Sequence, residues 1–383
     1  MFLTPRCFCP LATCENAMIR VLQIIPSLDR CGAEKQLTLL AQGLPRERFE
    51  VHVCALTRGG PLETPLREAG IPVTVIGKSW KIDPWAYARL RRLIVRLQPD
   101  LVHTWIFAAN AYGRWAAKSA GVKHLVAGER CVDSWKQWHE LAIDRYLARY
   151  TQRFVTNSSG VREFYAAHGL PADKFVVIPN GVAVGEPQSP RPREQVLAEL
   201  GLPADAWLIA AVNRLWPQKR VKDLIWAADL LKIVNARTHL LIFGDGPQRW
   251  RLERYRDQCE LSDRVHFLGA REDVPSLLPH CQCLWLGSGY EGQSNAILEA
   301  MAAGLPVIAT DIPGNRDLVL PEETGALVPV GDRAAFARRT NVLLEHPELA
   351  RRWGAAGRQR VLGEFSVQKM VDRHAALYEE LLG

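Results

Sequence analysis

Short apolar runs alternate with longer amphipathic stretches along the chain from Arg20 to the C-terminus. The short runs are rich in β-branched residues, which is typical of strands buried in a parallel sheet. The longer stretches carry apolar residues at helical spacing, so we expect a helix between successive strands. The pattern predicts an α/β fold with strands at residues 21–25, 51–56, 73–76, 101–103, 125–127, 154–156, 208–212, 240–243, 265–268, 284–286, 307–309 and 326–328.

The runs fall into two groups of six, which predicts two similar Rossmann-like domains that face one another across a cleft. The length of 383 residues agrees, because a single hydrophobic core rarely serves so long a chain. Pro187, Pro190 and Pro192 lie in a polar segment between the groups, which predicts a loop or linker. We expect domains at 18–172 and 173–365, a helix at 366–383 that crosses back to the first domain, and residues 1–17 that are disordered or precede a true start at Met18.

Polar and glycine-rich clusters follow directly after several predicted strands of the second domain. Open parallel sheets bind their ligands outside the carboxyl ends of the strands. Two such edges facing one another would enclose a cleft lined by these clusters. They are Asn213-Arg214, Gly244-Asp-Gly246, Gly269, the run from Gly287 to Glu291, and Asp311.

The segment Glu291-Gly-Gln-Ser-Asn-Ala-Ile-Leu-Glu299 joins an apolar strand-like run to an alanine-rich helix-like run. A glycine-containing turn that enters a helix leaves unpaired backbone N–H groups at the positive end of the helix dipole, which suits a phosphate. One carboxylate lies in the turn and the other about two turns into the helix. We therefore expect Glu291 and Glu299 to bind hydroxyl groups on either side of a diphosphate, as in a nucleotide-sugar.

Arg214 and Lys219 lie five positions apart just after a predicted strand, with Pro217 shaping the loop between them. Two fixed cations near a helix N-terminus can hold a diphosphate and offset the charge that it gains as a leaving group. An ordinary charged surface loop is the alternative, but the Glu291 turn in the same domain favours function. No Asp pair has the D-x-D spacing that binds a metal with a nucleotide-sugar, so we expect a metal-independent mechanism.

Three residues of the first domain are weaker candidates. Gly32 follows Cys31 in a loop that suits a phosphate or an acceptor, or that simply caps the next helix. His103 ends a predicted strand beside Trp105, and Arg130 follows another strand. Both can point into the cleft, although a histidine at a strand end is more often packed or hydrogen-bonded.

The net charge of +7 is distributed unevenly, since residues 1–180 hold 24 Lys and Arg against 15 Asp and Glu while residues 181–383 hold 24 against 26. A basic first half suggests an anionic partner such as a membrane surface, a lipid diphosphate or an acidic polysaccharide, and solvated helix faces explain it equally well. The segment 80–97 predicts a basic amphipathic helix that either lies on an anionic membrane or packs on its own domain. We expect no nucleic-acid partner.

Composition narrows the class of protein further. No apolar run reaches the roughly 18 residues that a membrane-spanning helix needs, and residues 1–17 lack the apolar core of a secretory signal. Nine cysteines without framework spacing indicate reduced thiols, and neither the cysteines nor the histidines have the spacing of a zinc site. We expect a cytoplasmic protein, either free or at the inner face of the membrane.

The run Gly287-Ser-Gly289-Tyr-Glu-Gly292 is also a literal G-x-G-x-x-G, and Asp311 ends the next strand as the ribose-binding acid of a dinucleotide fold would. An NAD-dependent oxidoreductase is therefore an alternative. Against it, Glu291 would repel a pyrophosphate inside the turn, and the motif comes late in the chain. A nucleotide-sugar epimerase of similar architecture and a non-catalytic adaptor for membranes or polyanions also stay open.

Five motifs in combination make the chain from Arg20 to Leu382 resemble the retaining glycosyltransferases of family four, which have the two-domain GT-B fold. The motifs are Val-Ile-Pro-Asn180-Gly181-Val, Arg214-Leu-x-x-x-Lys219, Phe-Gly244-Asp-Gly246-Pro, Glu291 to Glu299, and Glu299-Ala-Met-Ala-Ala-Gly304-Leu-Pro-Val. The resemblance implies that the second domain holds the nucleotide-sugar and the first domain the acceptor.

The resemblance also implies a role for each matching residue. Glu299 would bind the ribose, Glu291 the transferred sugar, and Arg214 with Lys219 the diphosphate. Main-chain groups of residues 293–295 would contact sugar and phosphate, and Arg271 would lie near the base. The candidate catalytic residues are Glu291, Arg214, Lys219 and His103, and the candidate donor-binding residues are Gly32, Arg130, Asn180, Gly244, Arg271, Gly292, Gln293, Ser294, Asn295 and Glu299.

The chain departs from the family pattern at four places. Cys31, Asn213 and Arg220 stand where the family usually has glycine, and His103-Thr-Trp105 replaces an H-x-H pattern, so that an indole occupies the position of a sugar-contacting histidine. We predict metal-independent, retaining transfer of a hexose-type sugar from a nucleoside-diphosphate-sugar to the hydroxyl of a carbohydrate or lipid-linked acceptor, in surface polysaccharide or glycolipid synthesis. No cofactor is expected.

Overall fold

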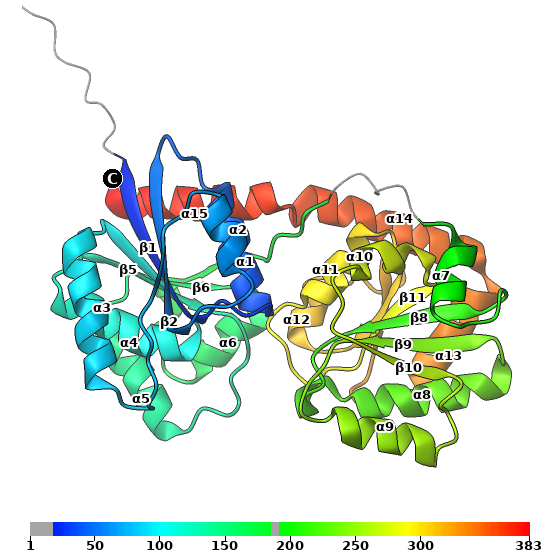
Figure 1. Cartoon of the computed structure of the whole chain (residues 1–383). Helices are drawn as coiled ribbons and strands as arrows, with labels where there is room; N and C mark the ends of the chain where they lie inside the picture. The colour runs from blue at the N-terminus through cyan, green and yellow to red at the C-terminus, as the bar shows by residue number, and fades with distance from the viewer. Residues whose placement is uncertain (1–17, 185–190) are drawn as a thin grey trace, which may run out of the picture.

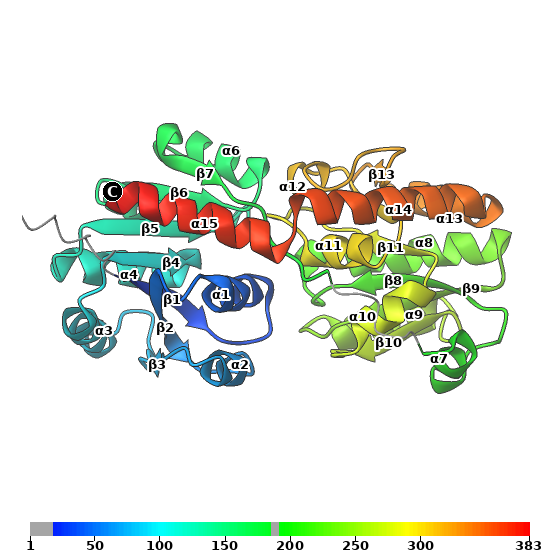
Figure 2. The ribbon, with the colours of Figure 1, turned by 90° about the horizontal axis from the view of Figure 1, so that it is seen from above.

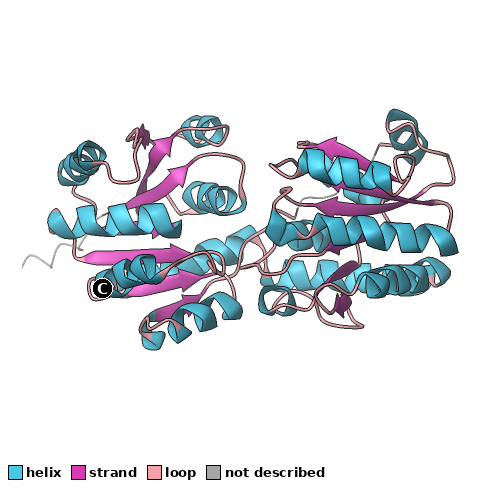
Figure 3. Cartoon of the chain, turned by 90° about the horizontal axis from the view of Figure 1, so that it is seen from below, coloured by secondary structure: helices cyan, strands magenta, loops and turns pink. Residues whose placement is uncertain are grey.

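Both groups of predicted strands form parallel sheets, each in a domain of its own (Figure 1). The computed structural model describes residues 18–184 and 191–383. The expectations for residues 1–17, Pro187 and Pro190 fall outside this range. Helices cover both faces of each sheet, as Figure 3 shows, so the strands are largely buried on both sides and are mostly apolar.

The first sheet has the strand order β3-β2-β1-β4-β5-β6-β7. Its strands are β1 (Ile19–Ser27), β2 (Phe49–Arg58), β3 (Val73–Val75), β4 (Leu101–Trp105), β5 (His124–Glu129), β6 (Arg153–Thr156) and β7 (Phe175–Val177). Its helices are α1 (Gly32–Gly43), α2 (Glu63–Glu68), α3 (Pro84–Leu97), α4 (Ile106–Ser119), α5 (Trp138–Leu147) and α6 (Ser159–Ala167).

The second sheet has the order β10-β9-β8-β11-β12-β13. Its strands are β8 (Trp207–Val212), β9 (Thr238–Phe243), β10 (Val265–Gly269), β11 (Cys283–Leu286), β12 (Val307–Thr310) and β13 (Gly325–Val328). The remaining helices are α7 (Arg193–Glu199), α8 (Val221–Val234), α9 (Arg249–Gln258), α10 (Val274–Leu277), α11 (Asn295–Ala302), α12 (Pro313–Arg316), α13 (Arg333–Glu345), α14 (Pro347–Glu364) and α15 (Val367–Leu382).

The prediction of six strands in the first sheet was wrong by one. The additional strand is β7, which has three residues and lies at the edge of the sheet, where it pairs with β6. A run of three residues is too short for periodicity to separate a strand from a loop, although the equally short β3 was predicted. The pairing of β7 with β6 is a tertiary contact, so only the assembled sheet reveals it.

The last two helices lie on different domains. Figure 2 shows α14 along the second domain and α15 across the first, with the C-terminus at the far end of the first domain. Met370, Val371 and Tyr378 of α15 are buried in the same apolar cluster as residues of β1, β2 and α1. The chain therefore returns to the domain in which it began.

Helix α3 packs on its own domain through its apolar face. Leu90, Leu93 and Ile94 are buried in one cluster with residues of β1, β4 and α4. Asp83 caps the helix by accepting a hydrogen bond from Ala86 N at 2.8 Å, and Pro84 occupies the first turn. The arginines of α3 are left facing solvent. No helix within residues 18–184 and 191–383 has the length and apolar character to cross a membrane.

Candidate active site

Glu291 and Lys219 are in contact at the carboxyl edge of the second sheet. Glu291 lies in the loop between β11 and α11, and Lys219 in the loop between β8 and α8. The Lys219 ammonium forms an ion pair with Oε1 of Glu291, and Ser288 Oγ donates to the same oxygen at 2.6 Å. The structure thus brings together the carboxylate expected to bind sugar and the cation expected to bind diphosphate.

The second carboxylate, Glu299, lies on α11 and contacts the first domain. Its Oε1 accepts a hydrogen bond from Lys35 Nζ of α1 at 2.5 Å. Arg214 also points toward the first domain, where its Nη1 lies 3.9 Å from Cys31 Sγ. Both carboxylates of the motif therefore lie next to cations, and one of these cations belongs to the opposite domain.

Asn180 connects the segment after β7 to the start of α11. Its backbone N–H donates to Gln293 Oε1 at 2.5 Å, and its side-chain amide donates to the Gln293 carbonyl at 3.2 Å and to Asn295 Oδ1 at 2.7 Å. Asn295 in turn donates to the Gly32 carbonyl at 3.3 Å. Four of the candidate donor-binding residues thus meet where the two domains touch.

Gly292 allows the two domains to approach one another closely at this point. A β-carbon on Gly292 would lie 2.0 Å from the Arg130 carbonyl oxygen and 2.7 Å from Asn157 Oδ1, both in the first domain. Since backbone cannot yield to such a contact, glycine is required here for packing between domains. Ser294 lies two residues after this glycine and directly precedes α11.

Gly244 is explained by packing within the second domain. Its φ is +128°, a conformation that favours glycine, and a β-carbon there would lie 2.0 Å from the Asn213 carbonyl oxygen. This contact places the loop after β9 against the loop that carries Arg214 and Lys219. The glycine therefore supports the shape of the cationic loop.

Arg130 is a buried cation with few partners. Its Nη2 donates to Asn180 Oδ1 and its guanidinium carbon lies 5.0 Å from the Trp105 ring centroid, but Nε and Nη1 have no hydrogen-bond partner among the described residues. Burial lowers the pKa of Arg130 to about 9. A buried guanidinium whose N–H groups lack partners is suited to bind an anion or hydroxyl groups.

His103 lies inside the first domain. Its Nδ1 is 2.7 Å from Tyr378 Oη of α15, and its ring stacks on Trp105 with 4.7 Å between centroids. Burial, followed by the charges of His374 and Arg130, holds the pKa of His103 well below its usual range, so the imidazole is neutral. A fully buried, packed ring favours the structural interpretation over the catalytic one.

Arg271 lies apart from the Asn180 cluster. Its guanidinium forms two hydrogen bonds of 2.7 Å with Asp273, and this interaction, together with Arg191, lowers the pKa of Asp273 to about 2. The adjacent Glu272 forms an ion pair with Arg30 of the first domain. Arg271 therefore borders the contact between the domains from the side of β10.

Two family models match the chain on either side of the domain boundary. The model "Glycosyltransferase Family 4" matches residues 31–186, and "Glycosyl transferases group 1" matches residues 192–360. The lipopolysaccharide core biosynthesis glycosyltransferase LpsE of Rhizobium meliloti is 30% identical over 343 residues, which cover 86% of this chain and 94% of that protein. The chain belongs to glycosyltransferase family 4.

Other relatives and structures resemble this glycosyltransferase over nearly its whole length. The UDP-Gal:alpha-D-GlcNAc-diphosphoundecaprenol alpha-1,3-galactosyltransferase of Escherichia coli is 28% identical over 97% of this chain and 99% of that protein. The crystal structure of Anabaena HepE in complex with UDP-glucose has a TM-score of 0.84 at 23% identity and covers 94% of this chain and 100% of that one. This likeness shows that the fold is GT-B.

Family membership decides against the oxidoreductase alternative, and the geometry agrees. Asp311, the acid of that interpretation, forms an ion pair with Arg316 at 2.5 Å. Gly292, the last glycine of its fingerprint, approaches the first domain as described above. The apparent fingerprint in this glycosyltransferase therefore has explanations within its own fold.

Sequence reasoning missed Gln36 of α1. Its amide exchanges two hydrogen bonds with the backbone of Gly181, at 2.9 and 2.8 Å, and donates to Asn295 Oδ1 at 3.3 Å. Gln36 is 1% exposed, which is unusual for a glutamine. The sequence signal that could have identified Gln36 was a polar residue at a buried position of the helix.

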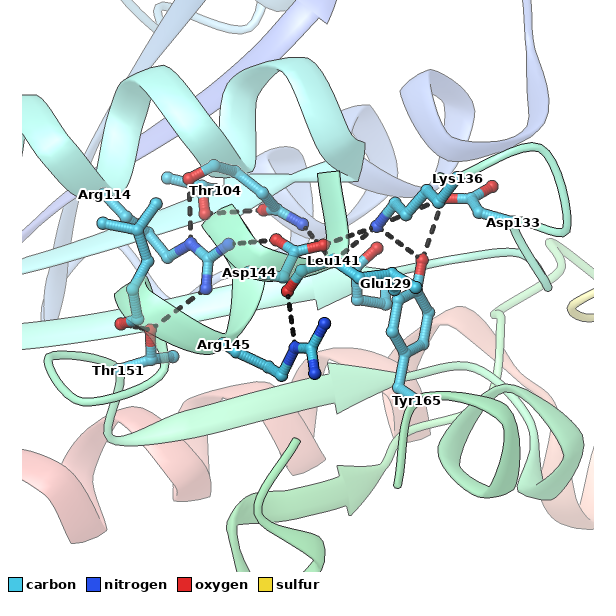
Figure 4. A network of polar contacts seen from close by, with 12 residues as sticks. Thr104, Arg114, Glu129, Asp133, Lys136, Leu141, Asp144, Arg145, Thr151 and Tyr165 are labelled. Carbon is cyan, nitrogen blue, oxygen red and sulfur yellow. Dashed lines mark hydrogen bonds and ion pairs between the residues drawn. The ribbon is translucent and has the colours of Figure 1, made fainter. Parts of the chain in front are cut away.

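A buried ionic network holds the loop that follows Arg130 (Figure 4). Lys136 Nζ lies 2.8 Å from Asp144 Oδ2 and from Tyr165 Oη, and 3.6 Å from carboxylate oxygens of Glu129 and Asp133. Burial raises the pKa of Glu129 to about 7, against the lowering effect of Lys136. Glu129, the residue before Arg130, is thus held by charged groups that the sequence pattern did not identify.

Proposed function

We propose that this glycosyltransferase moves a hexose-type sugar from a nucleoside-diphosphate-sugar to an acceptor hydroxyl, with retention of configuration and without a metal ion. The observation that carries the proposal is the pair of contacts at α11, where Glu291 meets Lys219 and Glu299 meets Lys35. These contacts place two carboxylates and two cations at the loop before α11 and along the helix itself, whose N-terminus is its positive end.

The donor would bind with its diphosphate at the loop before α11. The phosphate oxygens would accept hydrogen bonds from the backbone N–H groups of residues 292–294 and from Lys219 and Arg214. Lys219 would therefore leave Glu291 and pair with the phosphate. Glu291 would then accept hydrogen bonds from the transferred sugar, and Glu299 from the ribose. HepE, whose crystal structure contains UDP-glucose, supports a uridine nucleotide among the donors to test.

The transfer step needs a stabilised leaving group. The bond between the anomeric carbon and the diphosphate oxygen breaks, the acceptor oxygen forms a new bond to that carbon from the same face, and the acceptor proton passes to the departing diphosphate. Lys219, Arg214 and the helix N-terminus would offset the charge that develops on the diphosphate. This set of positive groups supports a metal-independent reaction.

The acceptor would bind on the side of the first domain. The Escherichia coli relative is named for a diphosphoundecaprenol-linked acceptor, which supports a lipid-linked or carbohydrate acceptor in surface polysaccharide or glycolipid synthesis. Such an acceptor would place the enzyme in the cytoplasm at the inner face of the membrane. Arg130, a buried cation with unfilled donors, is the first-domain residue that we propose to meet an anionic or hydroxyl group of a substrate.

A panel of UDP- and GDP-hexoses tests the proposal. We expect one donor to raise the melting temperature and to be hydrolysed slowly, with the same rate in EDTA as in magnesium. A ligand at about one hundred times its Kd stabilises a protein by about 2.7 kcal/mol, which a thermal shift detects. Proton NMR of the product reports the anomeric configuration. Isomerisation of the donor without an acceptor would instead indicate an epimerase, and stabilisation by NAD alone would reject the donor site.

A further inference from the structure

Five large apolar side chains are exposed at one edge of the first domain. They are Trp80, Ile82, Trp85, Trp135 and Trp138, which are between 54% and 81% exposed, and we call them the aromatic edge. Single exposed apolar residues are common, but a group of large ones at one place marks an interaction surface.

The aromatic edge lies where two loops leave the carboxyl ends of their strands. The loop between β3 and α3 carries Trp80 and Ile82, and the loop between β5 and α5 carries Trp135. Figure 1 shows that the starts of α3 and α5 lie toward the same end of the domain. The second of these loops begins at Arg130, which donates a hydrogen bond to Asn180 where the two domains touch.

Tyr112 of α4 holds the first loop in place. Its hydroxyl accepts a hydrogen bond from Asp83 N at 2.7 Å and donates to the Lys81 carbonyl at 3.0 Å. Helix α4 packs against both α3 and α5, so the loops that lead into these two helices flank the same helix. The exposed rings are thus presented by a fixed backbone.

The acidic residues near the aromatic edge already have partners, since Asp83 and Glu140 cap helices and Asp133 pairs with Lys136. Asp83 accepts from Ala86 N at 2.8 Å and Ser79 N at 3.1 Å, and Glu140 accepts from Gln137 N at 3.0 Å. The nearby cations bond to neutral groups. Lys78 Nζ lies 2.5 Å from the Trp80 carbonyl, and Arg89 of α3 donates to the Ile76 carbonyl at 2.9 Å. The surface therefore combines exposed indoles with positive charge.

Indoles and basic side chains together fit the interface of an anionic lipid bilayer. Tryptophan rings favour the headgroup region, and each Lys or Arg near an anionic surface contributes about 1 kcal/mol. A second copy of this chain fits less well, because a symmetric contact would set these cations against one another. We propose that the aromatic edge docks the enzyme on an anionic membrane surface, with the acceptor side of its cleft toward the lipid.

This inference deepens the proposed function, since it supplies the route by which a lipid-linked acceptor reaches the cleft. It also corrects the membrane interpretation of the segment 80–97. The apolar residues Leu90, Leu93 and Ile94 are buried against the sheet and unavailable to lipid. In the proposal, the start of α3 and the loop after β5 contact the lipid instead.

Vesicle co-sedimentation of the full chain tests the proposal. The probes are vesicles of phosphatidylcholine alone and of equal parts phosphatidylcholine and phosphatidylglycerol. We expect the wild type to sediment with the anionic vesicles, and the triple variant Trp80→Ser, Trp85→Ser and Trp138→Ser to bind at least about tenfold more weakly. Lys78→Gln with Lys81→Gln should weaken binding by about fivefold per cation at low salt.

Matched controls come from the second domain. Trp250→Ser on α9 removes an indole that is 59% exposed, and Arg251→Gln with Lys232→Gln removes the same net charge. These variants should bind vesicles like the wild type. Failure of the wild type to bind anionic vesicles, or equal weakening by the control variants, overturns the docking surface.

Two further measurements separate this proposal from the proposed function. The tryptophan variant should keep the wild-type melting temperature and the wild-type thermal shift with UDP, because its substitutions lie outside the donor site. A wild type that binds vesicles but no nucleotide would reject the donor assignment and leave the docking surface standing. Self-association of the wild type in sedimentation velocity, abolished in the tryptophan variant, would overturn membrane docking in favour of a second copy.

Discussion

The Lys219 ammonium and the Glu291 carboxylate neutralise one another across two loops that lie 72 positions apart in the chain. The cation belongs to the loop after β8 and the carboxylate to the loop before α11, so the pair exists only because β8 and β11 are neighbours in the sheet. In the proposed mechanism, a donor that draws Lys219 to its diphosphate would release Glu291 for the sugar. The ion pair thus holds both side chains at the carboxyl edge of the second sheet.

Glu291→Ala and Lys219→Ala should each lower activity much more than stability. Removal of one group that stabilises developing charge lowers kcat by about 100- to 1000-fold, whereas we expect a loss of about 1–3 kcal/mol in the free energy of unfolding. Steady-state kinetics with a verified donor and urea unfolding measure the two effects. The double variant Lys219→Met with Glu291→Gln should regain stability but not activity. Wild-type turnover in either single variant would refute these roles.

Arg130→Met should lower the activity of the enzyme without lowering its stability. Arg130 is buried and has no carboxylate partner within residues 18–184 and 191–383, so a neutral side chain of similar length relieves an unfavourable burial of charge. We expect an unchanged or higher melting temperature together with at least about tenfold lower activity. A variant that loses stability and retains activity would show that the guanidinium serves packing alone.

Gly292→Ala should disturb the contact between domains. The new β-carbon would meet the Arg130 carbonyl at 2.0 Å, so the domains must separate or the loop before α11 must shift. We expect at least about a tenfold loss of kcat/KM, because a small displacement of substrate-positioning groups is enough. Gly363→Ala on α14 is the matched control, since its β-carbon meets no atom within 4 Å and should stabilise the helix by up to about 1 kcal/mol.

Glu129 should make stability fall as the pH rises through neutrality. Its pKa is raised from the ordinary 4.5 to about 7 in the folded protein, chiefly by burial, so the folded state binds this proton more tightly than the unfolded state. The stabilising contribution is complete below pH 4.5 and is lost as the pH rises to about 7. Glu129→Gln should remove this contribution to the pH dependence. Melting curves of both proteins between pH 5 and 8 measure it, and parallel curves would contradict it.

The elements of the fold followed from local pattern. Each predicted strand in both domains corresponds to an observed one, because an apolar β-branched run of sufficient length has few alternatives to a buried strand. The exception, β7, has three residues and depends on pairing with β6. The family could also be predicted from the sequence, because each of the family motifs is a contiguous run of residues.

The residues of the candidate site also differ in whether local sequence or distant contacts reveal them. The residue types at Glu291, Glu299, Lys219 and Arg214 already implied anion and hydroxyl binding, because charge and hydrogen-bonding capacity belong to the side chain itself. Gln36 escaped detection, and the sequence named Asn180 and Gln293 without indicating that they contact one another. Their partners lie more than a hundred positions away, at 145 for Gln36 with Gly181 and 113 for Asn180 with Gln293.

The amino-acid sequence by itself determined the alternation of strands and helices, the two-domain family and the chemistry available near α11. Only the tertiary structure decided that Gly292 serves the contact between domains, that His103 is packed beneath α15, and that the tryptophans of α3 and α5 are exposed. The reason is physical: periodicity and side-chain chemistry are local properties, whereas burial and contact depend on how distant segments are oriented by the sheets that carry them.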